Sequence, residues 1–246
     1  MPPTDPPAST PPTALAGRTA LVTGASRGIG RSVALSLAQL GARLLVVARD
    51  RKALAEVQQE IVDLAAAAEV FPCDLASSSE IQALVSRVDA AGGCDILVNA
   101  AGIGRIGGPL HEMPLEDFEA VFATNVRAPF LLMRAVVPYM LAHGGGDVVN
   151  ISSLAGQGPL ANGAAYAASK WALNGLSYSV AEELRAHNIR VSVVAPGSVN
   201  TSFGGAGKDR AKMLQPEDVA AAVTMLVTQP RHAFISELRM RPTQKP

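Results

Sequence analysis

The sequence predicts an α/β fold: a single domain with a doubly wound parallel sheet of about seven strands and helices on both faces. Two observations support this fold class. From Thr19 onward, short β-branched apolar runs alternate with Ala- and Leu-rich stretches of helical period, which is typical of strand–helix units on a sheet buried on both faces. The length of 246 residues also suits one sheet, because α/β domains commonly reach this size without dividing.

The start of the chain is expected to lie outside this domain. Pro occupies six of the first twelve positions, interleaved with Thr, Ser and Asp, and such a segment cannot bury enough apolar surface to form a core. It also lacks the basic start and apolar run of a signal peptide. We predict a disordered proline-rich tail over residues 1–14 and one domain over residues 15–246.

Strand and helix alternate through the first half of the domain. Short apolar runs predict strands at Ala20–Thr23, Leu44–Ala48, Glu69–Cys73 and Ile96–Asn99. Between them, apolar residues recur every three or four positions and predict helices near Ile29–Leu40, Lys52–Ala66 and Ser79–Ala91.

The same alternation continues to the end of the chain. Strands are predicted at Asp147–Ser152, Arg190–Ala195 and Ile235–Met240. The intervening helical patterns are a long pair within Leu115–Leu141, then Ala164–His187 and Pro216–Thr228. A Gly-rich passage, Ser202–Gly207, predicts a mobile loop inside a short substrate lid over residues 198–215.

Composition and charge exclude several classes of function. The 21 basic residues balance 21 acidic ones, so nucleic acid is not an expected partner. No stretch approaches the ~18 uninterrupted apolar residues that a bilayer requires, so no membrane span is expected. The two cysteines, Cys73 and Cys94, form no CxxC pair or Cys/His cluster, which predicts no metal site and a reducing, cytoplasmic location.

A glycine-rich turn follows the first strand. It reads Thr23-Gly24-Ala25-Ser26-Arg27-Gly28-Ile29-Gly30 and leads directly into a helix. Glycines let the main chain approach a pyrophosphate, and the start of a helix offers free N–H groups and a positive dipole end. The spacing GxxxGxG also occurs in ordinary turns, but the strand–turn–helix context favours a Rossmann-type dinucleotide site. The residues predicted to bind the cofactor here are Gly24, Ser26, Arg27, Gly28, Ile29 and Gly30.

The end of the second strand indicates which dinucleotide is bound. An acidic residue there would bind the ribose 2′-hydroxyl of NAD(H), but this chain has Ala48 followed by Arg49. A cation suits a 2′-phosphate, and Arg27 adds a second positive charge. NADP(H) is therefore favoured over NAD(H). Asp50 leaves NAD(H) open, because a small backbone shift would bring its carboxylate to the ribose.

The third and fourth strands end at the same edge of the predicted sheet. Asp74 is expected either to meet the adenine or to cap the next helix, and Leu75 to pack on the adenine ring. Asn99, Ala100 and Gly102 follow the fourth strand, where small residues let a cofactor lie close.

Tyr166 and Lys170 lie four residues apart in a predicted helix and share one face. A neighbouring cation stabilises a phenolate, so we expect Lys170 to lower the pKa of Tyr166 and make it a general acid or base. Ser153 ends the fifth strand and is expected to hold a carbonyl oxygen together with Tyr166. Asn125 interrupts a helical run, either to hold a water beside Lys170 or to satisfy a helix bend.

Together these features resemble the short-chain dehydrogenase/reductase family. The resemblance lies in the TGxxxGxG turn, NAAG where many members have NNAG, the lone Asn, the Ser, the YxxxK pair and Pro196-Gly197, and it spans about Leu15 to Thr243. It implies a catalytic tetrad of Asn125, Ser153, Tyr166 and Lys170.

The resemblance also implies further cofactor contacts and an assembly. Lys170, beside Tyr166, would hold the nicotinamide ribose. Pro196 and Gly197 belong to the same motif set, and Val199 and Thr201 would lie beside the carboxamide. Members of the family typically assemble as homo-oligomers, so we expect a dimer or a tetramer formed through the long helices.

These features predict an NADP(H)-dependent oxidoreductase that transfers a hydride between nicotinamide and a small carbonyl compound or secondary alcohol. The predicted pocket is mostly apolar, and Arg105 either reads a substrate anion or stays solvated. The residues expected to line it are Ile103, Arg105, Leu154, Gln157, Leu160 and Phe203.

Two alternatives remain open. One is a 3-oxoacyl-thioester reductase that acts on acyl-carrier proteins, although the segment Ile235–Thr243 lacks the VDGG-like ending of those enzymes and residues 141–146 lack a basic docking cluster. The other is a non-catalytic sensor of dinucleotides, which would have no need of the set Ser153, Tyr166 and Lys170.

Overall fold

Seven parallel strands form one sheet, in the order β3-β2-β1-β4-β5-β6-β7, in the computed structural model, which describes residues 13–203 and 209–246. This confirms the predicted fold class. Most of the predicted tail over residues 1–14 and of the Gly-rich loop Ser202–Gly207 lies outside the described residues. The strands are β1 Thr19–Thr23, β2 Arg43–Ala48, β3 Ala68–Pro72, β4 Ile96–Asn99, β5 Gly146–Ile151, β6 Ile189–Pro196 and β7 Glu237–Met240.

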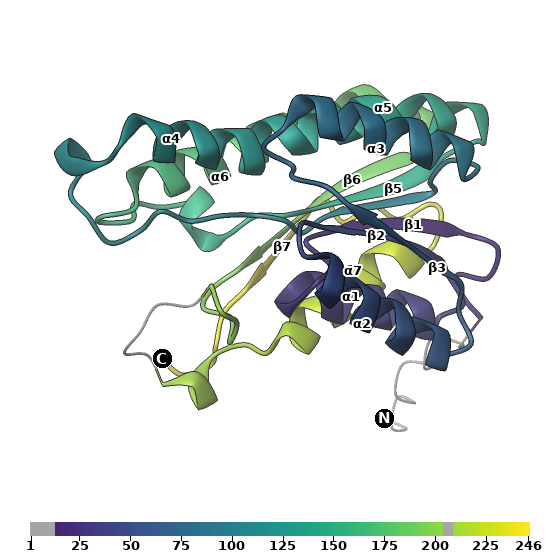
Figure 1. The fold of residues 1–246 in the computed structure, drawn as a ribbon, viewed down its shortest axis with the longest axis horizontal. Coiled ribbons are helices and arrows are strands. Elements are labelled where there is room, and N and C mark those ends of the chain that lie inside the picture. The colour runs from purple at the N-terminus through teal and green to yellow at the C-terminus, as the bar shows by residue number, and fades with distance from the viewer. Residues whose placement is uncertain (1–12, 204–208) are drawn as a thin grey trace, which may run out of the picture.

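Helices cover both faces of the sheet, with α1, α2 and α7 on one side and α3 to α6 on the other (Figure 1). Residues of β1 alternate between the two cores, because successive strand side chains point to opposite faces: Ala20 and Val22 face one core and Leu21 faces the other. The helices are α1 Gly28–Gln39, α2 Arg51–Asp63, α3 Ser78–Ala90, α4 Leu115–Phe122, α5 Ala128–Ala142, α6 Ala164–Leu184 and α7 Pro216–Thr228.

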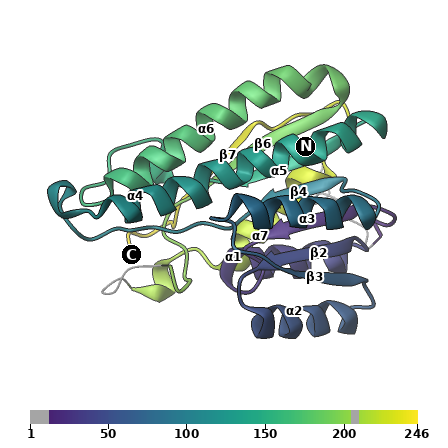
Figure 2. The ribbon, with the colours of Figure 1, turned by 45° about the horizontal axis from the view of Figure 1, so that its top comes forward.

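The helical run from α4 to α5 contains one turn of π-helix, η2, at Ala123–Arg127. Within the described part of the chain, the segment Leu115–Ala142 is the one long and apolar enough to cross a membrane by length and composition, with a mean hydropathy of 1.4. Half of its most apolar stretch is buried inside the fold, and Leu132 and Met140 pack in the core of the sheet. It lies beside α6 on the same layer (Figure 2), so it serves as a core element of this fold.

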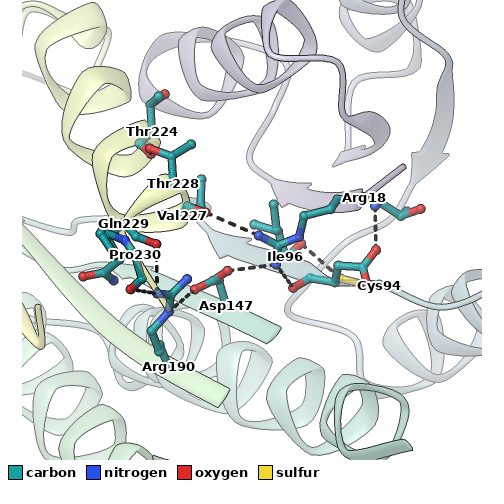
Figure 3. Close-up of polar contacts among 12 residues, drawn as sticks. Arg18, Cys94, Ile96, Asp147, Arg190, Thr224, Val227, Thr228, Gln229 and Pro230 are labelled. Atoms are coloured by element: carbon teal, nitrogen blue, oxygen red, sulfur yellow. Dashed lines mark hydrogen bonds and ion pairs between the residues drawn. The ribbon is translucent and has the colours of Figure 1, made fainter. Parts of the chain in front are cut away.

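An ion network ties together the amino ends of the central strands (Figure 3). The Asp147 carboxylate accepts from Arg18 Nη2 at 2.8 Å and from Arg190 Nε at 2.7 Å. Arg18 also donates to the carbonyl of Val227, and Arg190 to that of Gln229, both near the end of α7. The network therefore joins β1, β5, β6 and α7 at the edge of the sheet opposite the carboxyl ends of the strands.

At the carboxyl edge, the chain leaves neighbouring strands in opposite directions. From β1 it passes to α1 on one face, whereas from β4 it passes to α4 on the other face (Figure 1). Open α/β sheets form a crevice at such a switch point, and ligands bind there. This edge therefore holds the candidate site.

Candidate active site

The glycine turn after β1 is packed tightly against main chain. Gly24 has a φ of +67°, and a Cβ placed there would lie 2.8 Å from Cα of Ala101. A Cβ on Gly30 would collide with the carbonyl oxygen of Gly24. No larger residue fits at these two positions without displacing the backbone.

The start of α1 is left without a side-chain cap. Its preceding residue, Arg27, is extended and its side chain makes no capping hydrogen bond within the described structure. In contrast, Asp50 caps α2 and Ser77 caps α3 through their side-chain oxygens. The free N–H groups and positive dipole end of α1 fit an anion. Together with the glycine turn, they fit the pyrophosphate of a dinucleotide.

Two cations lie at the ends of the neighbouring strands β1 and β2. Arg27 and Arg49 are exposed, and neither forms an ion pair or a side-chain hydrogen bond with any described residue. Asp50 accepts a hydrogen bond of 3.1 Å from the main-chain N–H of Ala53. Its carboxylate is therefore engaged in capping α2, while both arginines remain available to a phosphate.

The residues after β3 have contacts of their own. Asp74 Oδ1 accepts from the N–H of Ala76 at 3.0 Å, and its main-chain N–H donates to Glu80. The interpretation of Asp74 as a helix cap is wrong, because Ser77 lies next to α3 and its Oγ accepts from Glu80 N. Leu75 is 6% exposed and packs in the core.

The loop after β4 is held on Thr23, whose Oγ1 accepts from the N–H groups of Ala100 and Ala101, each at 3.1 Å. Asn99 is buried and donates to Asn150 Oδ1 at 2.8 Å, while its own Oδ1 has no partner in the described structure. Gly102 faces the interior of the site, because a Cβ there would lie 3.4 Å from Asn125 Oδ1 and 3.6 Å from Lys170 Nζ.

The segment after β6 reaches back to the glycine turn. Pro196 ends β6, and the N–H of Gly197 donates to the carbonyl of Met240 at 2.8 Å. Val199 is buried, and the Thr201 methyl lies 3.1 Å from where a Cβ on Gly28 would stand. The predicted cofactor residues of β1 and β6 therefore meet at one place.

Tyr166 and Lys170 lie near the start of α6 and are 8% and 4% exposed. Lys170 Nζ donates to the carbonyl of Ile151 at 2.8 Å and lies 5.8 Å from the centre of the Tyr166 ring. Ser153 begins the short helix η3, Leu154–Gly156, and its side chain forms a hydrogen bond with Tyr166. The structure thus brings the predicted hydroxyl pair and the ammonium group together.

Burial dominates the electrostatics of this group. It raises the pKa of Tyr166, and the hydrogen bond with Ser153 opposes this effect. It also lowers the pKa of Lys170 from 10.5 to about 8. The prediction that Lys170 lowers the pKa of Tyr166 is therefore wrong for this arrangement, because desolvation outweighs the other effects and the ammonium is directed at the Ile151 carbonyl.

Asn125 lies in the π-helical turn η2 and is fully buried. Its Oδ1 accepts from the N–H of Ile103, and its Nδ2 donates to the carbonyl of Ile103, both at 2.9 Å. The same amide donates to Ser169 Oγ at 3.0 Å. Asn125 therefore fastens the loop after β4 to α6, beside the position where Gly102 faces Lys170.

Apolar side chains lie on the side of Tyr166 that faces Phe203 and near the start of α6. The ring of Phe203 lies 5.5 Å from it, centre to centre. A Cβ on Gly104 would meet both Phe203 and Ile106, and one on Gly163 would meet Leu160 and Ile106. Ile106 was not predicted from the sequence, although its apolar character in the loop after β4 is the signal that was available.

The polar residues predicted for this pocket are paired with other side chains. Arg105 Nε forms an ion pair with Asp117 Oδ1 at 2.9 Å, and Gln157 donates to Glu237 on β7. Leu154 lies against Gly197. The described side chains predicted to line the pocket are therefore mostly apolar, and Arg105 is ion-paired with Asp117.

Comparisons with known proteins match this geometry. A sequence model described as short chain dehydrogenase matches residues 18–238. An uncharacterized oxidoreductase of Staphylococcus saprophyticus is 34% identical over 231 residues, which cover 93% of this chain and 98% of the relative. A solved metagenomic short-chain oxidoreductase in complex with NADP is 49% identical, with a TM-score of 0.84, and the match covers 94% of this chain and 100% of that one.

A third similar protein has a more specific name. The structure of a 3-oxoacyl (acyl-carrier-protein) reductase from Agrobacterium tumefaciens with NADP bound is 28% identical, with a TM-score of 0.86. The match covers 93% of this chain and 94% of that one.

Proposed function

Because this chain belongs to the short chain dehydrogenase family of oxidoreductases, we propose that it transfers a hydride between NADP(H) and a carbonyl compound or secondary alcohol, with Tyr166 as general acid and base. The observation that carries this proposal is the grouping of three side chains, Ser153, Tyr166 and Lys170, at the carboxyl edge of the sheet. Ser153 is hydrogen-bonded to Tyr166, and Lys170 is fixed on the last residue of β5, one helical turn from the phenol.

Each of these side chains has a defined task in the proposed reaction. The nicotinamide, when bound, supplies or accepts the hydride. Tyr166 donates its proton to the substrate oxygen during reduction and takes it back during oxidation. Ser153 donates a second hydrogen bond to that oxygen. Lys170, whose ammonium donates to the carbonyl of Ile151, would hold the nicotinamide ribose. Asn125 fixes the loop beside them through the main chain of Ile103.

The cofactor is proposed to be NADP(H) rather than NAD(H). The glycine turn and the uncapped start of α1 would hold the pyrophosphate. Arg27 and Arg49 would hold the 2′-phosphate, which is supported by their lack of partners among the described residues and by the use of Asp50 as a helix cap. We assign four further residues to the cofactor because they lie at the same carboxyl edge of the sheet: Asp74, Leu75, Asn99 and Val199.

We propose an uncharged substrate with apolar substituents. Phe203, Ile106 and Leu160 present apolar surface around Tyr166. Arg105 is paired with Asp117, so the described wall has no unpaired arginine for a substrate carboxylate. The described residues of the predicted lid, 198–203 and 209–215, would complete this pocket.

A 3-oxoacyl thioester is the second candidate substrate, because the similar Agrobacterium protein is named as a reductase of that class. It requires the same proton and hydride transfers and differs only in the group that must enter the pocket. The non-catalytic sensor is not retained, because the family and the relatives are oxidoreductases.

The assembly and the compartment are further proposals. Large apolar side chains are exposed along α4, α5 and α6, including Phe118, Phe130 and Trp171, and they support a homodimer or homotetramer formed through these helices. Light scattering of the purified protein tests the assembly. Both cysteines are free and buried, which suits a reducing cytoplasm.

A substrate panel tests the proposed function. The purified protein is mixed with NADPH or NADH and with aliphatic ketones, aryl ketones, keto acids or 3-oxoacyl thioesters, and cofactor oxidation is followed by absorbance. We expect oxidation of NADPH with neutral apolar ketones and little with keto acids. Stable binding of NADPH without turnover of any compound would contradict the proposal, whereas turnover of thioesters alone would select the second candidate.

A further inference from the structure

Four side chains on α6 are spaced four residues apart and lie along one side of the helix: Tyr166, Lys170, Asn174 and Tyr178. Side chains at this spacing lie on neighbouring turns of one helix face. The first two belong to the proposed catalytic group. Asn174 contacts η3, the short helix that follows Ser153. Tyr178 contacts Glu237, which accepts a hydrogen bond from Gln157 at the end of η3.

Asn174 contacts this turn directly. It is 4% exposed, and its Nδ2 donates a hydrogen bond of 2.9 Å to the carbonyl oxygen of Gly156. Gly156 is the last residue of η3, the short helix that Ser153 begins. A buried carbonyl that loses its donor costs free energy, so this bond resists movement of the turn.

The turn also rests on the backbone of α6. A Cβ on Gly156 would lie 2.9 Å from Asn174 Nδ2 and 2.9 Å from the carbonyl oxygen of Lys170. The glycine thus lets the turn approach the helix between Lys170 and Asn174. This contact fixes the position of η3 along the axis of α6.

The orientation of Ser153 depends on the same turn. Ser153 Oγ accepts a hydrogen bond of 3.1 Å from the main-chain N–H of Ala155, within η3. A shift of η3 therefore moves the hydroxyl that faces Tyr166. The far end of the turn has a second anchor, since Gln157 donates to Glu237, whose carboxylate also accepts from Tyr178 Oη at 2.9 Å.

We propose that Asn174 is a positioning residue: by holding the Gly156 carbonyl, it sets the Ser153 hydroxyl against Tyr166 and so against the substrate oxygen. This inference rests on the proposed function. Asn174 touches neither substrate nor cofactor in this account and acts only through Ser153.

A double-mutant cycle separates this role from a merely structural one. Asn174→Leu, which removes the donor and keeps the branching of the side chain, is measured in the native background and in Ser153→Ala. We expect kcat to fall about tenfold in the native background and less than about twofold in Ser153→Ala. The second loss is small because Ser153→Ala has already removed the hydroxyl that Asn174 is proposed to position. The KM for NADPH should stay within about twofold.

The pH profile provides a second readout. The hydrogen bond from Ser153 lowers the pKa of Tyr166, so its loss should move the Tyr166 limb of the kcat/KM profile to higher pH. We expect the same direction of shift in Asn174→Leu and in Ser153→Ala. Ser177→Ala is the matched control, since Ser177 is buried on α6 and bonds to Asn150 and Leu173 rather than to the turn. It should leave kcat and the profile unchanged.

The outcomes are distinguishable. If Asn174→Leu lowers kcat equally in both backgrounds, or leaves kcat unchanged, the inference is overturned while the proposed function stands. If the native protein turns over no carbonyl compound, the proposed function fails and the inference fails with it. Should Asn174→Leu not fold, Asn174→Ala, which removes the donor without adding volume, takes its place in the same cycle.

Discussion

The side-chain nitrogen of Lys170 donates a hydrogen bond of 2.8 Å to the carbonyl oxygen of Ile151, the last residue of β5. This bond joins α6 to the strand that leads into Ser153. It also places an ammonium group in a fully buried position, which lowers the pKa of Lys170 to about 8. Burying the Lys170 ammonium therefore lowers the stability of the folded protein.

The first prediction concerns this cost. Because the pKa of Lys170 is lower in the folded state (about 8) than its ordinary value of 10.5, the unfolded chain holds more protons between these values. Lys170 should therefore contribute a rise in the free energy of unfolding of about 2 kcal/mol between about pH 8 and about pH 10. Urea denaturation of the native protein and of Lys170→Met across this range measures this contribution as the difference between the two proteins.

Lys170→Met provides the comparison for this measurement. Burial raises the pKa of Cys73 to about 11 and of Cys94 to about 12, so their contribution to stability is lost as pH rises. That contribution is common to both proteins, and the difference between them isolates Lys170. Equal pH dependence in Lys170→Met and in the native protein would show that Lys170 is not the titrating group.

The second prediction concerns cofactor choice. Arg49→Ala should weaken NADPH binding about tenfold and leave NADH binding within about twofold, because only NADPH carries the 2′-phosphate. Titration of both dinucleotides by fluorescence checks this. Arg185→Ala, which removes an exposed arginine paired with Glu182 near the end of α6, is the control for net charge. Equal losses for both dinucleotides in Arg49→Ala would contradict the 2′-phosphate assignment.

The third prediction concerns the ion network at the opposite edge of the sheet. Asp147→Asn should lower the free energy of unfolding by about 2 to 3 kcal/mol, since Arg18 and Arg190 lose their shared carboxylate in a largely buried place. The kcat of the folded variant and its affinity for NADPH should not change, because Asp147 and Arg190 lie at the starts of β5 and β6, opposite the carboxyl edge that holds the site. Thermal unfolding and steady-state kinetics on the same sample test both parts. Glu182→Gln, in an exposed ion pair, should change stability by less than about 0.5 kcal/mol.

The local parts of this structure are predictable from the sequence. The spacing of apolar residues identifies strands and helices, because these elements depend mainly on residues a few positions apart in the chain. The shared face of Tyr166 and Lys170 follows from helix geometry alone. The glycine turn was recognisable because Gly24 and Gly30 occur at positions where the main chain allows no side chain.

The long-range parts are not predictable in the same way. The direction of the Tyr166 pKa shift depends on burial, which the whole fold determines. Ile106 and Leu160 both lie beside Gly163, where a Cβ would collide with Leu160, and this approach of two loops follows from the whole fold. Asp74 and Ser77 are both good helix caps, so the sequence alone does not choose between them. The turn from Asp74 to Ser77 places Ser77 next to α3, and Ser77 is the cap.

The most direct test of the proposed mechanism is the turnover of Tyr166→Phe. With a ketone that the native protein reduces, we predict that kcat for NADPH oxidation falls at least about a hundredfold, because the proton donor is lost. The dissociation constant for NADPH should change by no more than about twofold, since the glycine turn and both arginines are intact. Unchanged ketone-dependent oxidation of NADPH by Tyr166→Phe would contradict the assignment of Tyr166 as the general acid and base.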